Sequence, residues 1–147
     1  MLRHTHNSNT PGAFLSLDFE KAYDSVDHIF TIKVLEAFGI PNWFIKWVKL
    51  AFKSSSMQLM VNGYLTAHFP MLGGGKQGDP LYPYIFLMVM TAMAAQIELD
   101  DTINGLKHPN IDKPITTIQF ADDSPFMIGS ESDFIHIVSH LNRFELA

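Results

Sequence analysis

The chain of 147 residues contains no cysteine. This absence excludes disulfide bonds, thiolate metal sites and cysteine nucleophiles, and it fits a reducing compartment. Basic residues are scarce as well. The chain contains ten Lys and Arg and 15 Asp and Glu, which gives a net charge of -5. A surface that binds nucleic acid unaided normally carries an excess of Lys and Arg. We therefore expect any nucleic-acid contact to depend on metal ions or on a basic surface outside this chain.

Long apolar runs are also few. The stretch 81–97 carries no charge, but its 17 residues lie at the lower edge of the length of a membrane-spanning helix. Pro83 and Gln96 interrupt it, and Glu98 follows it directly. A buried core helix is the favoured interpretation, with no membrane partner. The composition, 47% hydrophobic and 17% charged, predicts a folded globular domain rather than a disordered chain.

Residues 1–12 are polar and predict a disordered lead-in without a secretory signal, so the folded domain is expected over 13–147. Apolar periodicity and cap residues then predict a series of elements. These are a strand over 13–19 buried on both faces, helices over 28–38, 42–52, about 81–99 and 131–144, a hairpin around Asn62-Gly63, and a surface connection over 100–113. Asp27 is the expected cap of the first helix, and Ser130 or Ser132 that of the last. The aromatic stripe of 42–52 is expected in the core.

Two adjacent acids, Asp122 and Asp123, lie between apolar runs in the stretch 116–128. The pattern predicts a β-hairpin with both carboxylates at its turn. Two neighbouring carboxylates repel each other unless a cation lies between them. A solvated Asp-Asp turn is the simpler alternative for such a pair. A third acid, Asp18, ends the first predicted strand, where a buried carboxylate needs a cation or several hydrogen bonds.

A glycine-rich loop covers 71–80, with glycines at 73, 74, 75 and 78 and Lys76 among them. Such a backbone can approach a ligand closely, although a plain flexible loop explains the composition equally well. The loop lacks the Gly-Lys-Ser/Thr ending of a nucleoside-triphosphatase loop. His136 and His140 lie one helical turn apart, and without a metalloprotease-type glutamate we interpret them as ordinary helix positions.

Three segments together resemble the palm of reverse transcriptases, and most of all those of non-LTR (LINE-type) retrotransposons and their group II intron relatives. The segments are Leu17–Val26 (LDFEKAYDSV), Lys76–Leu81 (KQGDPL) and Phe120–Asp123 (FADD). They occur in the family's order, and the likeness covers nearly the whole chain from about Gly12. The resemblance implies an α+β fold in which a small antiparallel sheet carries the acids and helices pack on one face.

The resemblance also implies two Mg²⁺ ions, for which Mn²⁺ is a substitute, bound by hard oxygen ligands. In the family pattern Asp18 and Asp122 bridge the metals, Asp123 completes the acidic cluster, and the Phe19 carbonyl is a further ligand. Tyr23 falls where the family places an aromatic gate against the 2′-hydroxyl of a ribonucleotide. The residues expected beside the nucleotide, template and primer end are Lys76, Gln77, Gly78, Phe120 and Ala121.

Three positions depart from the family pattern without touching the implied metal ligands. Lys76 stands where Arg is usual and so lacks the bidentate fork of a guanidinium. Tyr82 stands where a small Ser is common. Pro125 removes an N–H from the strand that leaves the acid pair, which predicts an edge or kinked strand there.

The function implied is that of an RNA-directed DNA polymerase that transfers nucleotides from dNTPs to a DNA primer on an RNA template. The fingers and thumb regions of the family are missing from this stretch, so we expect the isolated fragment to be inactive. The main alternative is a truncated or decayed element fragment with no polymerase activity by itself. An RNA-templated RNA polymerase is weaker, because those enzymes usually show Gly-Asp-Asp, and only the carboxylates support a two-metal nuclease. The element type implies an intracellular location, in the cytoplasm or the nucleus.

Overall fold

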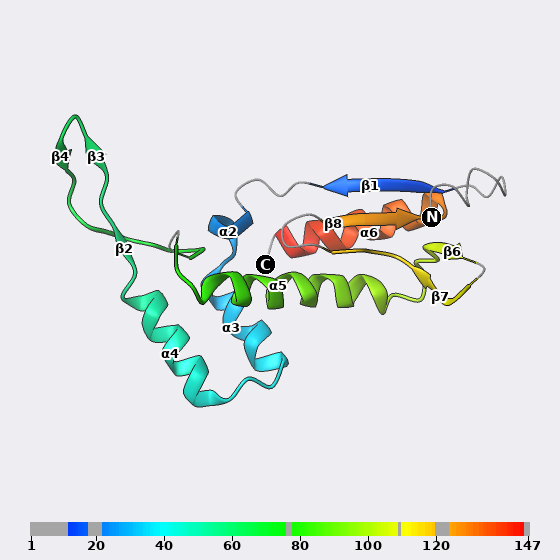
Figure 1. Ribbon diagram of the computed structural model, residues 1–147, viewed down its shortest axis with the longest axis horizontal. Helices are drawn as coiled ribbons and strands as arrows, with labels where there is room; N and C mark the ends of the chain where they lie inside the picture. Colours follow the sequence, from blue (N-terminus) through cyan, green and yellow to red (C-terminus); the bar gives the residue numbers. More distant parts are fainter. Residues whose placement is uncertain (1–11, 18–21, 76–77, 109, 120–123, 146–147) are drawn as a thin grey trace. The chain divides into compact units, whose positions relative to one another are not determined.

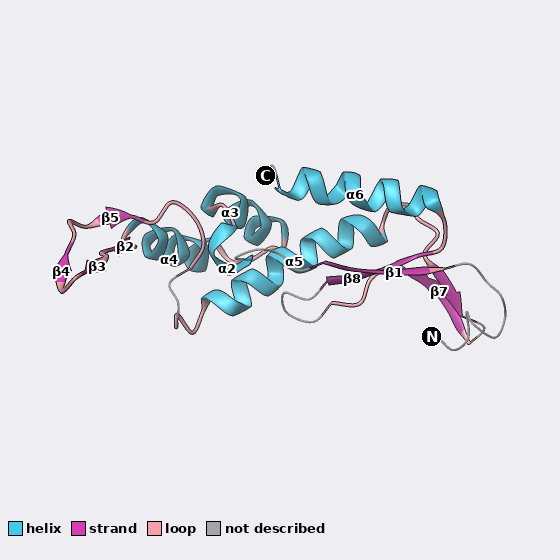
Figure 2. Cartoon of the chain, turned by 90° about the horizontal axis from the view of Figure 1, so that it is seen from above, coloured by secondary structure: helices cyan, strands magenta, loops and turns pink. Residues whose placement is uncertain are grey.

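A computed structural model describes residues 12–17, 22–75, 78–108, 110–119 and 124–145 (Figures 1 and 2). The contacts divide the chain into two compact units. Unit 1 comprises Met1–Phe19 and Met90–Ala147, and unit 2 comprises Glu20–Val89. One long helix, α5 (Tyr82–Glu98), begins in unit 2 and ends in unit 1, as predicted for the uncharged stretch.

Unit 2 begins with three helices, α2 (Ala22–Ser25), α3 (His28–Ala37) and α4 (Asn42–Lys53). The Asp27 carboxylate caps α3 by accepting a 2.8 Å hydrogen bond from the Phe30 N–H, as predicted. Gly39, at φ +72°, then turns the chain so that α3 and α4 pack side by side (Figure 1). Their core cluster consists of Ile32, Leu35, Ile45, Val48 and Ile85.

The aromatic stripe of α4 was expected in the core, and this expectation is wrong for its two tryptophans. Trp43 is 65% exposed and Trp47 is 69% exposed. Only Ile45 and Val48 of α4 are fully buried. The face of α4 that packs on α3 is narrow, and the tryptophans project from the other side of the helix.

Short strands follow α4 in unit 2. β3 (Met60–Val61) and β4 (Tyr64–Leu65) pair across Asn62 and Gly63, whose φ angles of 51° and 84° are those of a tight hairpin turn. This confirms the predicted hairpin. β2 (Ser56–Met57) pairs with β5 (Phe69–Pro70) closer to the helices.

Unit 1 is built on the antiparallel pair β1 (Ala13–Leu17) and β8 (Ser124–Ile128), which lie side by side in Figure 1. Phe126 and Met127 of β8 are buried. The expectation that β1 is buried on both faces is wrong, because Ala13, Phe14 and Ser16 are exposed. In the part of the chain that the structure describes, β8 is the one strand that pairs with β1.

Pro125 predicted an edge or kinked strand, and among the described residues β8 lies in a two-stranded sheet with β1 as its one strand partner. It pairs with β1 and also forms a bridge between Phe126 and Thr117. The Pro125 carbonyl accepts a 3.1 Å hydrogen bond from the Ile118 N–H. Because the N and the carbonyl of a strand residue point to the same side, the missing N–H faces residues 116–118 and leaves the pairing with β1 intact.

The expected surface connection over 100–113 is also wrong in part. β6 (Leu106–His108) and β7 (Ile111–Ile115) form a second hairpin there, and Ile103 and Leu106 are buried. The last helix, α6 (Glu131–Glu145), packs against β8, and Ser130 caps it as predicted by accepting from the Asp133 N–H at 3.2 Å. The result is the predicted α+β arrangement of helices with small antiparallel sheets. Across the described ranges, every helix is too short or too polar to cross a membrane.

Candidate functional site

The structure describes two of the ten predicted site residues, Tyr23 and Gly78. The remaining eight lie outside the described residues: Asp18, Phe19, Lys76, Gln77, Phe120, Ala121, Asp122 and Asp123. The described segments that flank these residues lie in both units.

In unit 1 the register of β1 and β8 opposes the two residues that flank the predicted acids in the sequence. Leu17 directly precedes Asp18, Ser124 directly follows Asp123, and the two pair with each other at the end of the strand pair. These two positions are 107 residues apart along the chain. Only the fold brings them together, since neither lies near the other in sequence.

The chain that leads toward the acid pair is held against β8 as well. The Met127 N–H donates to the Thr116 carbonyl at 2.8 Å, and the Thr117 hydroxyl donates to the Pro125 carbonyl at 3.2 Å. Residues 116–118 and β8 thus run antiparallel on either side of residues 120–123, as expected of a hairpin. Residues 116–118 form a single bridge, between Thr117 and Phe126, and not a regular strand.

A buried carboxylate, Asp133 at the start of α6, fixes the far end of β8. It accepts hydrogen bonds from the N–H groups of Gly129 at 2.9 Å, Gly105 at 3.0 Å and Asn104 at 3.0 Å. The Ser130 hydroxyl donates to it at 2.8 Å. Burial raises the pKa of Asp133, but these hydrogen bonds outweigh burial and leave the pKa lowered. Sequence reasoning missed this residue, whose only signal was its place three residues after a cap serine.

His136 and His140 on α6 contact the turn after α5. His140 Nε2 lies 2.8 Å from the Asp100 carboxylate, and His136 Nδ1 lies 2.5 Å from the Thr102 hydroxyl. The hydrogen bonds from Thr102 and His140 lower the pKa of Asp100. Within the described ranges, no three acidic or histidine side chains form a group that could hold a metal ion. The interpretation of the two histidines as structural helix positions agrees with these contacts.

In unit 2 the predicted gate residue, Tyr23 on α2, is supported by two rings of α5. Its ring centroid lies 4.4 Å from that of Phe86 and 6.5 Å from that of Tyr82. Tyr23 itself is 37% exposed, so one part of the ring is packed and another remains accessible. The packing restricts how the Tyr23 ring can turn.

The glycine-rich loop packs against α2 rather than projecting freely. The Gly75 N–H donates to the Tyr23 carbonyl at 3.3 Å and the Gly74 N–H to the Val26 carbonyl at 2.8 Å. A Cβ on Gly74 would lie 2.6 Å from the Asp24 Cα, so a side chain has no room there. Gly74 and Gly75, which directly precede the second motif segment, are therefore in contact with the first. Gly74 and Gly75 allow the loop to approach α2 closely, which neither the ligand-binding loop nor the plain flexible loop predicted.

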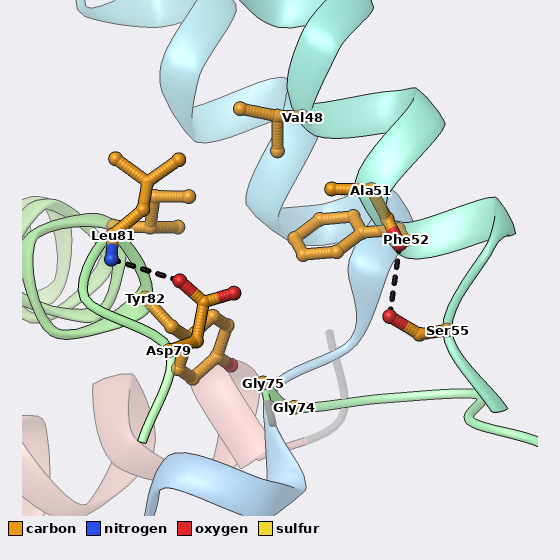
Figure 3. Close-up of a pocket in the computed structure, with 10 residues that line it drawn as sticks. Val48, Ala51, Phe52, Ser55, Gly74, Gly75, Asp79, Leu81 and Tyr82 are labelled. Atoms are coloured by element: carbon orange, nitrogen blue, oxygen red, sulfur yellow. Dashed lines mark hydrogen bonds between the residues drawn. The ribbon is translucent and has the colours of Figure 1, made fainter. Parts of the chain in front are cut away.

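The packing of the Tyr82 ring accounts for the glycine at position 75 and for a large side chain at position 82. The ring covers Gly75, where an added Cβ would lie 2.0 Å from the ring, and only 4% of Tyr82 is exposed. Burial, and after it the charge of Asp24, raise the pKa of Tyr82 to about 12, so the phenol is neutral at pH 7. Figure 3 shows Tyr82 beside Asp79 and Gly75 at a cavity of about 20 Å³ that α4 closes. The cavity has room for one water and not for a nucleotide.

His28 at the start of α3 is a further supporting residue that sequence reasoning did not identify. Its ring stacks on Phe52 with centroids 3.9 Å apart, and its Nε2 lies 2.7 Å from the Gly74 carbonyl. Gly78, at φ +85°, has open space where a Cβ would stand. Its left-handed backbone, and not a close contact, accounts for the glycine.

The model of the reverse transcriptase (RNA-dependent DNA polymerase) family matches residues 2–145. Similar curated proteins come from retrotransposable elements. The Pol polyprotein of element R2DM from Drosophila melanogaster is 34% identical over 61% of this chain and 8% of its own length. The transposon TX1 149 kDa protein from Xenopus laevis is 32% identical over 76% of this chain and 8% of its own length. An R2 Pol polyprotein from Popillia japonica is 31% identical over 74% of this chain.

The chain spans only 8% to 18% of the length of these relatives. Among solved structures, apo telomerase from Candida tropicalis, truncated from its C-terminal domain, superposes with a TM-score of 0.63. That match covers 96% of this chain and 30% of the telomerase chain at 12% identity, and it supports the fold alone. The family match and the retrotransposon relatives confirm the resemblance carried by the three motifs. The chain belongs to the reverse transcriptase (RNA-dependent DNA polymerase) family, among its members from non-LTR retrotransposons.

Proposed function

We propose that this chain forms the palm of an RNA-directed DNA polymerase, in which Asp18, Asp122 and Asp123 form the catalytic acidic cluster. The register that opposes Leu17 and Ser124 is the observation that carries the proposal, because it pairs the two residues next to these acids. The bridge between Thr117 and Phe126 adds a second restraint on the approach to the acid pair.

The donor set fits Mg²⁺, which prefers carboxylate oxygens and keeps several waters. Asp18, Asp122, Asp123 and the Phe19 carbonyl are the groups that would hold two such ions. Two bound Mg²⁺ ions, or Mn²⁺ in their place, supply activation of the primer 3′-oxygen and stabilise the charge on the departing pyrophosphate.

The remaining predicted residues position the substrates. Tyr23, held by Phe86, would exclude the 2′-hydroxyl of a ribonucleotide by steric contact. The contact between the glycine-rich loop and α2 supports a place for Gln77 and Gly78 close to this gate, with Lys76 offering its charge to the nucleotide or template. Phe120 and Ala121 would lie under the primer end. The partners are then an RNA template, a DNA primer and dNTPs.

Primer extension on an RNA template with Mg²⁺ or Mn²⁺ tests this proposal. The double variant Asp122→Ala, Asp123→Ala is expected to lose at least about 100-fold in rate, because bound metal supplies several kcal/mol of charge stabilisation. The matched control is Asp101→Ala, Asp112→Ala, which removes the same charge from two exposed positions. In a protein that extends the primer, equal rates in the two double variants would contradict the proposal.

The isolated chain is expected to be inactive, since it spans so little of its relatives. Where the reading frame extends on either side, the longer protein is assayed in parallel with the same variants. Activity in the longer protein alone supports a palm that needs its neighbouring regions. Inactivity of both supports the alternative of a decayed element.

A further inference from the structure

Basic residues are concentrated in one part of this acidic chain. Residues 28–78 contain five lysines and a single acid, Glu36, for a net charge of +4. The rest of the chain carries five basic and 14 acidic residues, for a net charge of -9. The overall charge of -5 therefore hides a basic segment that includes α3 and α4. A basic contact to nucleic acid therefore does not have to come from outside the chain.

Helix α4 presents the lysines of this segment beside exposed aromatic rings. At 3.6 residues per turn, Trp43, Trp47 and Leu50 lie within an arc of about 60°. All three are more than half exposed. Lys46, Lys49 and Lys53 form a second stripe along one side of the first, and α4 contains no acid. We call these six side chains the Trp–Lys surface.

Most of this surface is available for a partner. Lys49 lies 3.4 Å from Glu36 and is partly neutralised. Among the described residues, neither Lys46 nor Lys53 forms an ion pair. Lys53 also lies in the last turn of α4, where a positive charge favours the helix dipole, but this role does not account for Lys46 or for the tryptophans.

Exposed tryptophans next to lysines match the chemistry of single-stranded nucleic acid. Bases stack on aromatic rings whatever their sequence, and phosphates attract the adjacent charges. Trp43 and Trp47 are one turn apart, with Cβ atoms about 6 Å from each other, so two bases could engage them in succession. A protein partner suits this surface less well, because lysine is depleted in the cores of protein interfaces.

We propose that the Trp–Lys surface of α4 binds a single-stranded nucleic acid, with stacking on Trp43 and Trp47 and phosphate contacts to Lys46 and Lys53. The proposal adds to the proposed polymerase function, in which a template strand has to be held outside the acidic cluster. It assigns a role to residues that none of the three family motifs contains.

The chain has only two tryptophans, and both lie on this surface, so their fluorescence reports on it directly. The full chain is titrated with oligouridylate of about 12 nucleotides, and with the deoxy form in parallel. Quenching is expected, and the tighter oligonucleotide identifies the strand. Trp43→Ala and Trp47→Ala are each expected to weaken binding on the order of tenfold, measured by anisotropy of a labelled oligonucleotide. Trp→Phe variants, which keep a ring, should recover most of the affinity.

Lys46→Gln with Lys53→Gln is expected to make the slope of log affinity against log salt shallower by about 1.4. Lys107→Gln with Lys113→Gln has the same net charge and should bind like the wild type, as should Phe134→Ala on α6. Circular dichroism checks that each variant folds. Absence of quenching, or unchanged affinity in the α4 variants, would overturn the proposal. So would self-association of the wild-type chain that the Trp→Ala variants abolish without an effect on oligonucleotide binding.

The polymerase proposal can fail separately. Asp122→Ala, Asp123→Ala is expected to bind the oligonucleotide like the wild type, since these acids lie outside the Trp–Lys surface. Binding without any primer extension, even in an extended protein, would contradict the polymerase and leave the surface intact. Primer extension by the wild-type protein, together with unchanged oligonucleotide affinity in the α4 variants, would contradict only the proposal for the Trp–Lys surface.

Discussion

Individual glycines of this chain serve different purposes that the sequence does not distinguish. Gly39 and Gly74 both adopt a positive φ, of 72° and 66°. Around Gly39 nothing lies near the site of a Cβ, whereas at Gly74 the backbone of Tyr23 and Asp24 occupies that place. Gly39 is required by its dihedral angle alone, and Gly74 by both its angle and the close approach of α2.

Replacement of Gly74 by alanine is therefore expected to destabilise the protein more than replacement of Gly39. Gly39→Ala should cost about 1 kcal/mol, the penalty of a left-handed backbone. Gly74→Ala adds a clash with backbone atoms that cannot move aside, and we expect a loss of at least about 3 kcal/mol. Urea denaturation of both variants measures the difference. Equal losses would show that the contact between the loop and α2 is not tight.

Asp133 is the residue whose charge contributes most clearly to folding. Asp133→Asn places an amide N–H against backbone donors, and a loss of about 2 to 3 kcal/mol is expected at pH 7. Because the pKa is lowered in the folded state, the ionised carboxylate stabilises the fold above its unfolded pKa of about 3.9. This stabilisation disappears as the pH falls through that value toward the folded pKa.

The difference between wild type and Asp133→Asn should consequently shrink below about pH 4. Denaturation at a series of pH values from neutral to acid provides the measurement. Asp112→Asn, at an exposed position, serves as the control and should change little. A difference that stays constant with pH would exclude the charge of Asp133 as the cause.

At the scale of elements, local signals predicted the helices well. Asp27, Gly39 and Ser130 mark helix ends through their own hydrogen bonds or dihedral angles, so their effect is readable from a few neighbours. The spacing of apolar residues in α4 located the helix but not its environment. Periodicity tells which residues share a face, and it cannot tell whether another element covers that face, as Trp43 and Trp47 show.

Strands depended more strongly on distant partners. The Asn62-Gly63 turn specified its hairpin locally. The hairpin of β6 and β7 was missed because charges at Lys107, Asp112 and Lys113 conceal the alternation that a strand normally shows. β1 was placed correctly but judged too buried, since its small and apolar residues do not reveal that few neighbours cover it.

The N-cap of α3 gives a direct test of local specification. Asp27→Ala is expected to lower the free energy of unfolding by about 1 kcal/mol, because the Phe30 N–H loses its acceptor. Asp27→Ser keeps an acceptor oxygen at the cap and should retain most of that stability. Thermal denaturation followed by circular dichroism compares the two. A serine variant as unstable as the alanine variant would point to the charge of Asp27, and not its cap, as the stabilising feature.

For the whole molecule, the acidic site could not be derived from periodicity or composition. Nothing in the local sequence relates Leu17 to Ser124, whose pairing depends on the complete fold. The family motifs relate Asp18 to Asp122 and Asp123, and because these acids lie outside the described residues, that relation stays a prediction. The family pattern does not predict every residue, however. It gives no reason for Tyr82, whose ring packs over Gly75 in the structure.

Chain connectivity predicts an order of folding. Unit 2 is one continuous segment, whereas unit 1 joins Met1–Phe19 to Met90–Ala147. Contacts distant in sequence form slowly, because closing a long loop costs entropy. In pulse-labelled hydrogen exchange during refolding, amides of α3 and α4 are expected to gain protection before those of β1 and β8. Protection of β1 first would contradict this order.

Helix α5 contributes buried side chains to both units, among them Val89 to unit 2 and Met90 to unit 1. An insertion of one residue within the part of α5 that belongs to either unit would rotate the helix residues on one side of it by about 100° and turn buried positions of that unit outward. The number of residues in α5 is therefore constrained, although no single side chain of the helix shows this. Insertions and deletions should accumulate at places such as the Asn62-Gly63 turn and be rare between Tyr82 and Glu98, even where individual residues of the helix vary freely.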